Sequence, residues 1–220
     1  MSVAPRAQNS SGWSAYAWVP LVLMLVILVW RVLYQQGVVS AQMGNLSPLM
    51  AFAFVGAILF PKPLPWWAWA ALLLVVDWFS MGAQWWASAH GRVEVLFAYG
   101  VYAVAAWWGG RLRGKAGIVD TLLGTLTCSV VFYLVTNSVS WWVEPYYAKN
   151  GAGWVQALTV GLQGMGYPTT LEFFRNSLVA DLLGAAVLLT VYHAEAVVRK
   201  LRFMPLVGWG RGVHGVPAGA

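Results

Sequence analysis

The chain has 220 residues, of which 60% are hydrophobic and only 9% are charged, against about 25% charged residues in an ordinary soluble protein. Its formal net charge is +6, but the basic residues stand between apolar runs and form no patch interleaved with aromatic residues. The composition therefore predicts an integral membrane protein embedded in a lipid bilayer, and it argues against nucleic-acid binding. The single cysteine, Cys128, lies within an apolar run. It excludes a disulfide framework and is expected to be a small core residue.

Six apolar segments are predicted to be transmembrane helices, each compared with the roughly 20 residues that a helix needs to cross hydrocarbon. The second of them is short, so it is expected to tilt or to cross only part of the bilayer. The predicted segments cover about residues 15–34, 47–60, 65–81, 93–108, 117–139 and 171–198.

A seventh, shorter helix is expected between the fifth and sixth segments. In that stretch Trp154, Leu158 and Leu162 recur at helical spacing, which is typical of a short helix lying at the membrane interface. The whole chain is thus expected to be all-α. It has a polar N-terminal tail at 1–14, one transmembrane helix-bundle domain at 15–200 and a flexible Gly/Pro-rich cytoplasmic tail at 201–220.

The basic residues predict the orientation of this bundle. If the N-terminus is cytoplasmic, the inner segments carry nine Lys and Arg residues and the outer loops carry three. Cytoplasmic loops of membrane proteins are enriched in Lys and Arg. Both termini are therefore predicted to be cytoplasmic, and the longer loops are predicted to lie on the outer face.

Five polar residues fall at depths where hydrocarbon is expected: Arg31, Asp77, Asn137, Asn176 and Asp181. A charge at the bilayer centre costs about 2.5 to 3.5 kcal/mol on insertion scales unless it is paired or wetted. Asp181 is expected to meet Asn137 or Arg31 from another helix. Arg31 and Asp77 lie near the outer ends of their helices, where they either pair with each other or snorkel separately. Interhelical hydrogen bonding, contact with a substrate or ion, and a proton relay all stay open for the set.

No residue pattern predicts an enzyme. The three histidines, His90, His193 and His214, are far apart, and no known nucleophile, phosphate-binding or metal-binding motif is present in a fitting context. We therefore expect no catalytic residue, no metal site and no cofactor.

Several segments together carry a resemblance: NLSP followed by AFAFVGA, then LLLVVD, FAYGVYAVAAWWGGRL, LVTNSVSWW and YPTTLEFFRNSLVADLLG, over roughly residues 20–195. In order and spacing they resemble an uncharacterised family of bacterial integral membrane proteins. That family is similar to the substrate-binding S components of energy-coupling factor (ECF) vitamin transporters. The resemblance implies a multi-pass protein of the bacterial inner (cytoplasmic) membrane. It also implies a six-helix bundle whose outward pocket, for a vitamin-sized molecule, is covered by the loops after the first and fifth helices.

One segment departs from the S-component pattern. S components commonly carry an AxxxA patch on the first helix for docking to a shared transmembrane subunit, and here the bulky sequence LVLMLVILVW stands in its place.

The function expected from these observations is the binding and uptake of a small molecule without chemistry on it, together with membrane partner subunits. The expected substrate-binding residues are Asn45, Asp77, Asn137, Trp141, Asn176 and Asp181, with Tyr146, Tyr147 and Tyr167 as a lid. The alternative is a non-catalytic structural or assembly subunit of a larger membrane complex, in which the polar residues only hold helices together.

Overall fold

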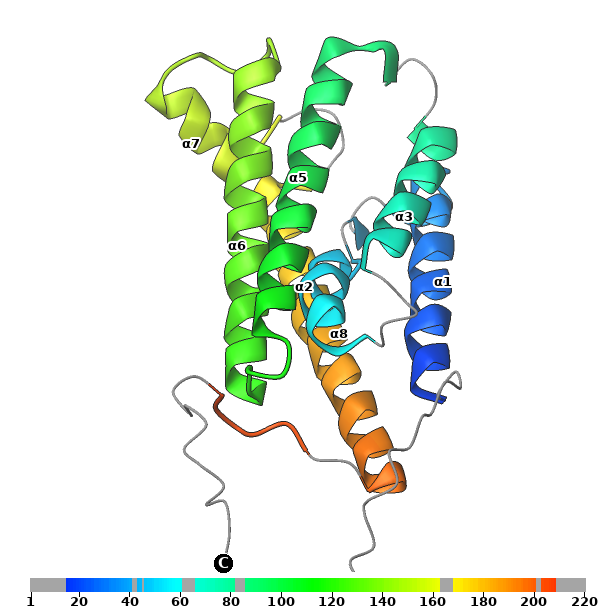
Figure 1. Cartoon of the computed structure of the whole chain (residues 1–220). Coiled ribbons are helices and arrows are strands. Elements are labelled where there is room, and N and C mark those ends of the chain that lie inside the picture. The colour runs from blue at the N-terminus through cyan, green and yellow to red at the C-terminus, as the bar shows by residue number, and fades with distance from the viewer. Residues whose placement is uncertain are drawn as a thin grey trace, which may run out of the picture.

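A computed structural model of the chain describes residues 15–40, 43–44, 46–60, 66–81, 86–162, 168–200 and 203–208. Within these residues the secondary structure is helical and contains no strand. The helices are arranged lengthwise around a short central one (Figure 1). They are α1 (Ala15–Gln35), α2 (Leu49–Leu59), α3 (Trp66–Met81), α5 (Ala89–Leu112), α6 (Ile118–Val143), α7 (Gly151–Thr159) and α8 (Thr170–Arg199).

The all-helical prediction is confirmed for this part of the chain. Six of the helices correspond to the six predicted segments, and α7 covers Trp154 and Leu158 of the predicted short helix but ends at Thr159, before Leu162. α6 ends at Val143, four residues beyond the predicted 139, and α5 begins at Ala89 and ends at Leu112, four residues beyond the predicted 93–108 at both ends. Ser88 caps its start by accepting a hydrogen bond from the backbone N–H of Gly91 at 2.9 Å.

The short helix α2 forms the centre of the bundle. All of its 11 residues, LMAFAFVGAIL, are buried, and it contacts α3, α5, α6 and α8. A helix that is apolar on every side has no face for water. At 1.5 Å per residue it is about 16 Å long, roughly half of the 30 Å hydrocarbon core. The second predicted segment is therefore a buried half-length helix.

Glycines let three neighbours approach α2 closely. A Cβ on Gly109 of α5 would collide with the backbone oxygen of Phe54, and one on Gly124 of α6 would collide with the Phe54 ring. On α8, a Cβ on Gly184 would overlap the ring of Pro48, which precedes α2. Small residues let α5 pack against the backbone of α2 and let α6 and α8 pack against the rings of Phe54 and Pro48.

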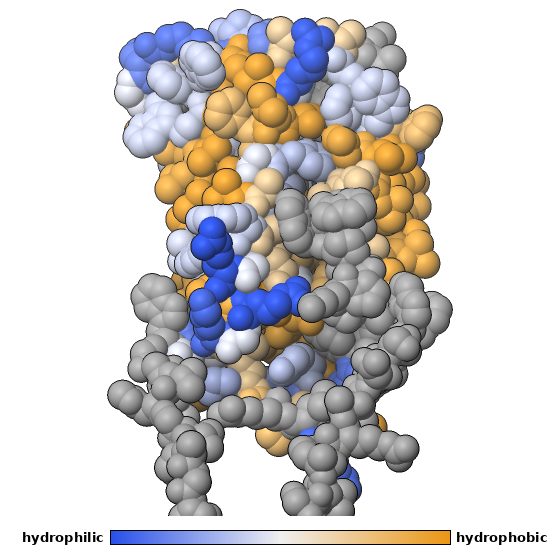
Figure 2. Space-filling model, viewed as in Figure 1, coloured by the Kyte–Doolittle hydropathy of each residue, from blue (hydrophilic) through white to orange (hydrophobic). Residues whose placement is uncertain are grey.

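The helices α1 and α3 form a pair at the edge of this core (Figure 1), where α1 contacts α3 and α8 while α3 contacts α2 and α5. Much of their apolar surface faces outward. Leu25 and Val26 of α1 are 61% and 59% exposed, and Phe79 of α3 is 80% exposed. In Figure 2 hydrophobic side chains gather over the middle of the visible face, and hydrophilic ones lie toward its upper end and on its lower half.

Among the described residues, two helices are long and apolar enough to cross a membrane. They are α6 and residues 170–198 of α8. Shorter apolar stretches lie in α1, α2 and α3.

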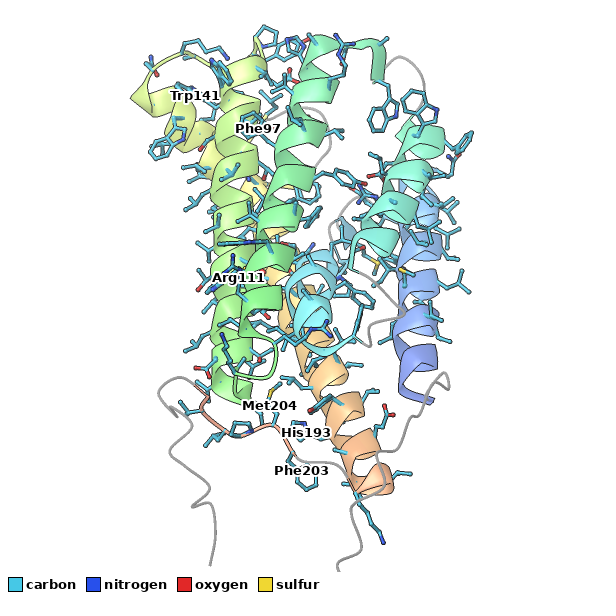
Figure 3. The ribbon with its side chains drawn as sticks, viewed as in Figure 1. Phe97, Arg111, Trp141, His193, Phe203 and Met204 are labelled. Carbon is cyan, nitrogen blue, oxygen red and sulfur yellow. The ribbon has the colours of Figure 1, made fainter. Side chains whose placement is uncertain are left out.

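A short piece of the segment predicted as a C-terminal tail is packed against the bundle. The carbonyl oxygens of Pro205 and Leu206 accept hydrogen bonds from the first two N–H groups of α6, at 2.9 and 3.0 Å. Phe203 stacks on His193 of α8, with ring centroids 5.9 Å apart, and Figure 3 shows the two rings at the lower end of α8. For residues 203–208 the prediction of a flexible tail is therefore wrong, because their carbonyls satisfy the open end of a helix.

Candidate functional site: a polar cavity above a buried helix

Asp181 caps the N-terminus of α2 from the side. One of its carboxylate oxygens accepts the backbone N–H groups of Met50 and Ala51 at 3.0 and 3.2 Å, and the other accepts the Ser129 hydroxyl at 2.7 Å. The first N–H groups of a helix have no partner within the helix, and the helix dipole favours a negative charge there. Asp181 was expected to meet Asn137 or Arg31. That expectation is wrong, because the open amides of α2 and a hydroxyl of α6 supply the donors.

Arg113, just after α5, caps the opposite end of α2. Its guanidinium donates two hydrogen bonds to the carbonyl of Ala57, at 3.0 and 2.7 Å, and one to that of Phe60, at 2.9 Å. A cation at the C-terminal end of a helix satisfies the last carbonyls and opposes the dipole. The buried helix therefore has a charged side chain from another element at each end.

A cavity of about 380 Å³ lies beside the N-terminal end of α2. It is bounded by the last residues of α1, by the second halves of α3 and α6, and by the first halves of α5 and α8. This is the half of the bundle opposite residues 203–208, which pack on the start of α6. The lining residues recur one helical turn apart, singly on α3, α6 and α8 and as adjacent pairs on α1 and α5, so that each helix presents one face to the cavity. The full set of lining residues, including those at the start of α2, is Trp30, Arg31, Tyr34, Gln35, Ser47, Leu49, Met50, Leu73, Asp77, Glu94, Val95, Ala98, Tyr99, Tyr102, Phe132, Thr136, Ser140, Ser177 and Asp181.

On one wall of the cavity, Asp77 of α3 binds three side chains. The Arg31 guanidinium pairs with both carboxylate oxygens, and its outer contact, from Nη2, measures 2.8 Å. The Tyr99 hydroxyl donates at 3.0 Å and the Gln35 amide at 3.3 Å. Of the two alternatives for Arg31 and Asp77, the structure therefore has the salt bridge. This network ties the edge pair α1 and α3 to α5.

On the facing wall, α5 and α6 contribute Glu94 and Ser140. The Ser140 hydroxyl donates to the Glu94 carboxylate at 2.7 Å. Deeper along the same two helices, the rings of Tyr102 and Phe132 stack with centroids 4.9 Å apart. This wall therefore changes from aromatic to acidic along its length.

Of the expected substrate-binding residues, Asp77 and Asp181 line the cavity. Asn176 and Asn137 are not among the lining residues. The Asn176 amide donates to the carbonyl of Gly44 at 3.2 Å and so fastens the segment before α2 to α8. The Asn137 amide donates to the carbonyl of Tyr133, one turn earlier in its own helix, at 2.8 Å. Asn45 lies outside the described residues.

Trp141, expected to bind substrate, and the described lid residues Tyr146 and Tyr147 lie outside the cavity lining. The Trp141 indole donates to the carbonyl of Ala148 at 2.9 Å, at the end of α6 near α7 (Figure 3). Tyr146 is 68% exposed and Tyr147 is buried, and neither lines the cavity. Burial, together with the nearby Glu144 and Glu94 carboxylates, raises the pKa of Tyr147 and keeps its hydroxyl protonated. Tyr167 falls outside the described residues.

Sequence reasoning missed Glu94, Tyr99 and Ser140. Glu94 lies at the edge of the predicted segment 93–108 and was not singled out. Because α5 begins at Ala89, Glu94 is in the second turn of the helix, and Tyr99 follows it at i+5 on the cavity face. A polar residue one or two turns inside a helix, with aromatic residues following on the same face, was the available signal.

The lining residues combine polar and apolar groups. Charged and hydroxyl groups stand next to Trp30, Leu73 and Phe132, a combination that orients a ligand while burying its apolar surface. Among the described residues no three His, Cys, Asp or Glu side chains gather closely enough to hold a metal ion.

Fold and site together define a helix-bundle protein with a polar cavity built around a buried, charge-capped half-helix. The chain belongs to a family of unknown function, DUF6580, which matches residues 13–203. No curated protein and no solved structure matches the chain. The resemblance to S components therefore stays an expectation from the sequence.

Proposed function

We propose that the chain is a multi-pass protein of the bacterial inner membrane that captures a small molecule in the cavity and takes part in its uptake. The carrying observation is the cavity itself. Its volume, about 380 Å³, is at the lower end of the roughly 300 to 1,000 Å³ found for ligand sites. Polar and apolar side chains from six helices line it.

The exposed surface supports a membrane location. Large apolar side chains face outward on α1, α3, α5 and α8, with Leu96 70% and Leu183 62% exposed. Soluble monomers rarely expose apolar patches larger than a few hundred Å². Besides α6 and α8, α1 has 21 residues and α5 has 24, which matches the roughly 20 residues needed to span hydrocarbon. The half-length α2 is tolerated at that depth because protein surrounds it on all sides.

The position of the cavity supports uptake from outside. In the orientation inferred from Lys and Arg, both termini are cytoplasmic, and the cavity lies in the half of the bundle away from residues 203–208. It is therefore closer to the outer face. A binding component of this kind performs no covalent step and would act with membrane partner subunits that move the captured molecule inward.

Ligand-dependent stabilisation tests the proposal. The purified full chain is heated in detergent with a panel of vitamin-sized cations, anions and neutral compounds. Any compound that binds the folded state raises Tm. The variant Ala98→Phe fills the cavity, whereas Ala103→Phe adds the same group at an exposed position of the same helix.

We expect at least one compound to raise Tm of the wild type and of Ala103→Phe, and to lose most of its effect on Ala98→Phe. Failure of every compound on the wild type would overturn the proposal. A shift that is equal in both variants would also overturn it, because binding would then lie outside the cavity.

The assembly-subunit alternative is favoured by a different observation. Three of the buried polar side chains form hydrogen bonds to backbone groups of this chain and so connect its segments: Asn176, Asp181 and Arg113. A protein of that kind would co-purify with its partners in fixed stoichiometry after mild detergent extraction. It would also show no cavity-dependent Tm shift with any compound.

A further inference from the structure

The three carboxylates that line the cavity differ in what neutralises them. Asp77 pairs with the Arg31 guanidinium. Asp181 accepts two amides at a helix N-terminus and one hydroxyl. Glu94 accepts the Ser140 hydroxyl, and no cation of the described part of the chain lies within ion-pair distance of it. Within the cavity wall, Glu94 is therefore the carboxylate whose charge the protein leaves least compensated.

Among the described residues, no group around Glu94 forms an ion pair with it. Its electrostatic neighbours are His90, one turn earlier on α5, which attracts the carboxylate without an ion pair, and Glu144 after α6, which is a like charge. Arg31, which carries the one guanidinium among the described lining residues, is held on Asp77. Glu94 is partly buried, and burying a charge costs free energy unless it is paired. The natural complement to this wall is therefore a positive group brought by the ligand.

Two other features of the lining fit such a group. The aromatic residues Trp30, Tyr99 and Phe132 border the same space, and the faces of aromatic rings attract cations. The side-chain oxygen of Gln35 is buried and has no donor among the described residues. Its orientation is set by the amide nitrogen, which donates to Asp77. Gln35, like Glu94, therefore presents an acceptor that an N–H group can satisfy.

We propose that the cavity binds a protonated organic amine with a compact apolar or aromatic body, and that its ammonium group pairs with Glu94. This inference rests on the proposed function, since it names the class of ligand for the same cavity. The charge of Glu94 would then serve to bind the ligand, whereas the charges of Asp77 and Asp181 hold helices of the protein together.

Three matched probes test the charge class on the purified full chain: phenethylamine, its neutral analogue 2-phenylethanol, and the anion phenylacetate. Dissociation constants are measured by titrating Tm. We expect the amine to bind best to the wild type, with the anion weakest. Glu94→Gln removes the charge and keeps the size, so it should weaken amine binding about tenfold or more, which is about 1.4 kcal/mol or more. Binding of the neutral probe should stay unchanged.

Glu144→Gln is the matched control, because it removes the same charge from a neighbour that does not line the cavity. It should keep most of the amine affinity. Without ligand, Glu94→Gln should melt no lower than the wild type, since it removes an uncompensated carboxylate. The comparison of the three probes on the wild type needs no variant to fold.

The outcomes separate this inference from the proposed function. If the neutral probe or the anion binds the wild type as well as the amine does, or if Glu94→Gln binds the amine unchanged, the cavity binds ligands but the amine inference is overturned. It is also overturned if neutral or anionic members of the vitamin-sized panel stabilise the chain through the cavity while no amine does. If no compound of any charge stabilises it, both proposals fall.

Discussion

The polar groups at the ends of α2 have their hydrogen-bonding partners within the protein, whereas those on the cavity wall are only partly paired. At one end of α2, Asp181 accepts hydrogen bonds from two backbone amides and from the Ser129 hydroxyl. At the other end, Arg113 donates three hydrogen bonds to backbone carbonyls. On the cavity wall, Glu94 has one hydroxyl partner and Gln35 has an acceptor without a donor among the described residues. Buried polar groups that serve the fold are expected to be satisfied by it. Polar groups beside a cavity that lack hydrogen-bonding partners do not add to stability, and such departures are typical of functional sites.

The same contrast appears in the packing. Around α2 the neighbours touch through Gly109 and Gly124, with no room for even a methyl group. On the other half of the bundle the edge pair α1 and α3 stands off from α5 and α6, and the space between them is the cavity. The hydrogen bonds of Asp77 with Arg31 and Tyr99 connect the pair α1 and α3 to α5 across this space. Changes near α2 should therefore affect folding, and changes on the cavity wall should affect binding.

The largest effect is expected from Asp181→Ala. The substitution leaves two backbone amides and the Ser129 hydroxyl buried without their acceptor, which should lower the free energy of unfolding by about 3 kcal/mol or more. The measurement is thermal unfolding of the purified protein in detergent, together with the yield of monodisperse protein. Ser129→Ala removes only one of the three bonds and should cost clearly less. An Asp181→Ala protein that melts like the wild type would show that α2 does not depend on this cap.

A smaller loss is expected from Gly109→Ala. The new methyl group collides with the backbone at Phe54, and backbone cannot turn aside as a side chain does. Overpacking of this kind typically costs about 1 to 3 kcal/mol. The adjacent Gly110→Ala is the control, because nothing lies within 4 Å of a Cβ there. It should be neutral or slightly stabilising, since alanine favours a helix over glycine. Equal melting of the two variants would contradict the close contact of α5 with α2.

Much of this contrast is absent from the sequence. The helices were predictable because long apolar runs are interrupted by Pro61 and by polar loops, although Gly109 and Gly110 misplaced the end of α5, which continues to Leu112. The shortness of the second segment was visible too. That it lies at the centre was not, because an apolar run of this length reads the same whether lipid or protein surrounds it. The cap on α2 was equally hidden, since backbone amides have no sequence signature and only the polar partner Asp181 stands out.

The candidate site was predictable only where two unusual residues meet. Arg31 and Asp77 were placed at similar depth by their positions in two helices, so a salt bridge was one of two expectations and the structure has it. Glu94 was not singled out because charged residues at the ends of membrane helices are common and uninformative. Its place on the cavity wall depends on where α5 begins and on how α5 faces α6, and both follow from tertiary packing.

The smallest effect is expected from Tyr99→Phe. The change removes one hydrogen bond to Asp77 and keeps the ring, and Arg31 and Gln35 still hold the carboxylate. The loss of stability should be about 1 kcal/mol. Tyr146→Phe, at an exposed position away from the cavity, should change neither stability nor ligand response and serves as the control. Because Tyr99 ties α5 to the edge pair, the variant should also alter the Tm shift produced by a cavity ligand. If the Tm of Tyr99→Phe is lower but every ligand shifts it as much as it shifts the Tm of the wild type, the Asp77 network contributes to folding and not to binding. The division between a folding half and a binding half would then have to be drawn closer to Glu94.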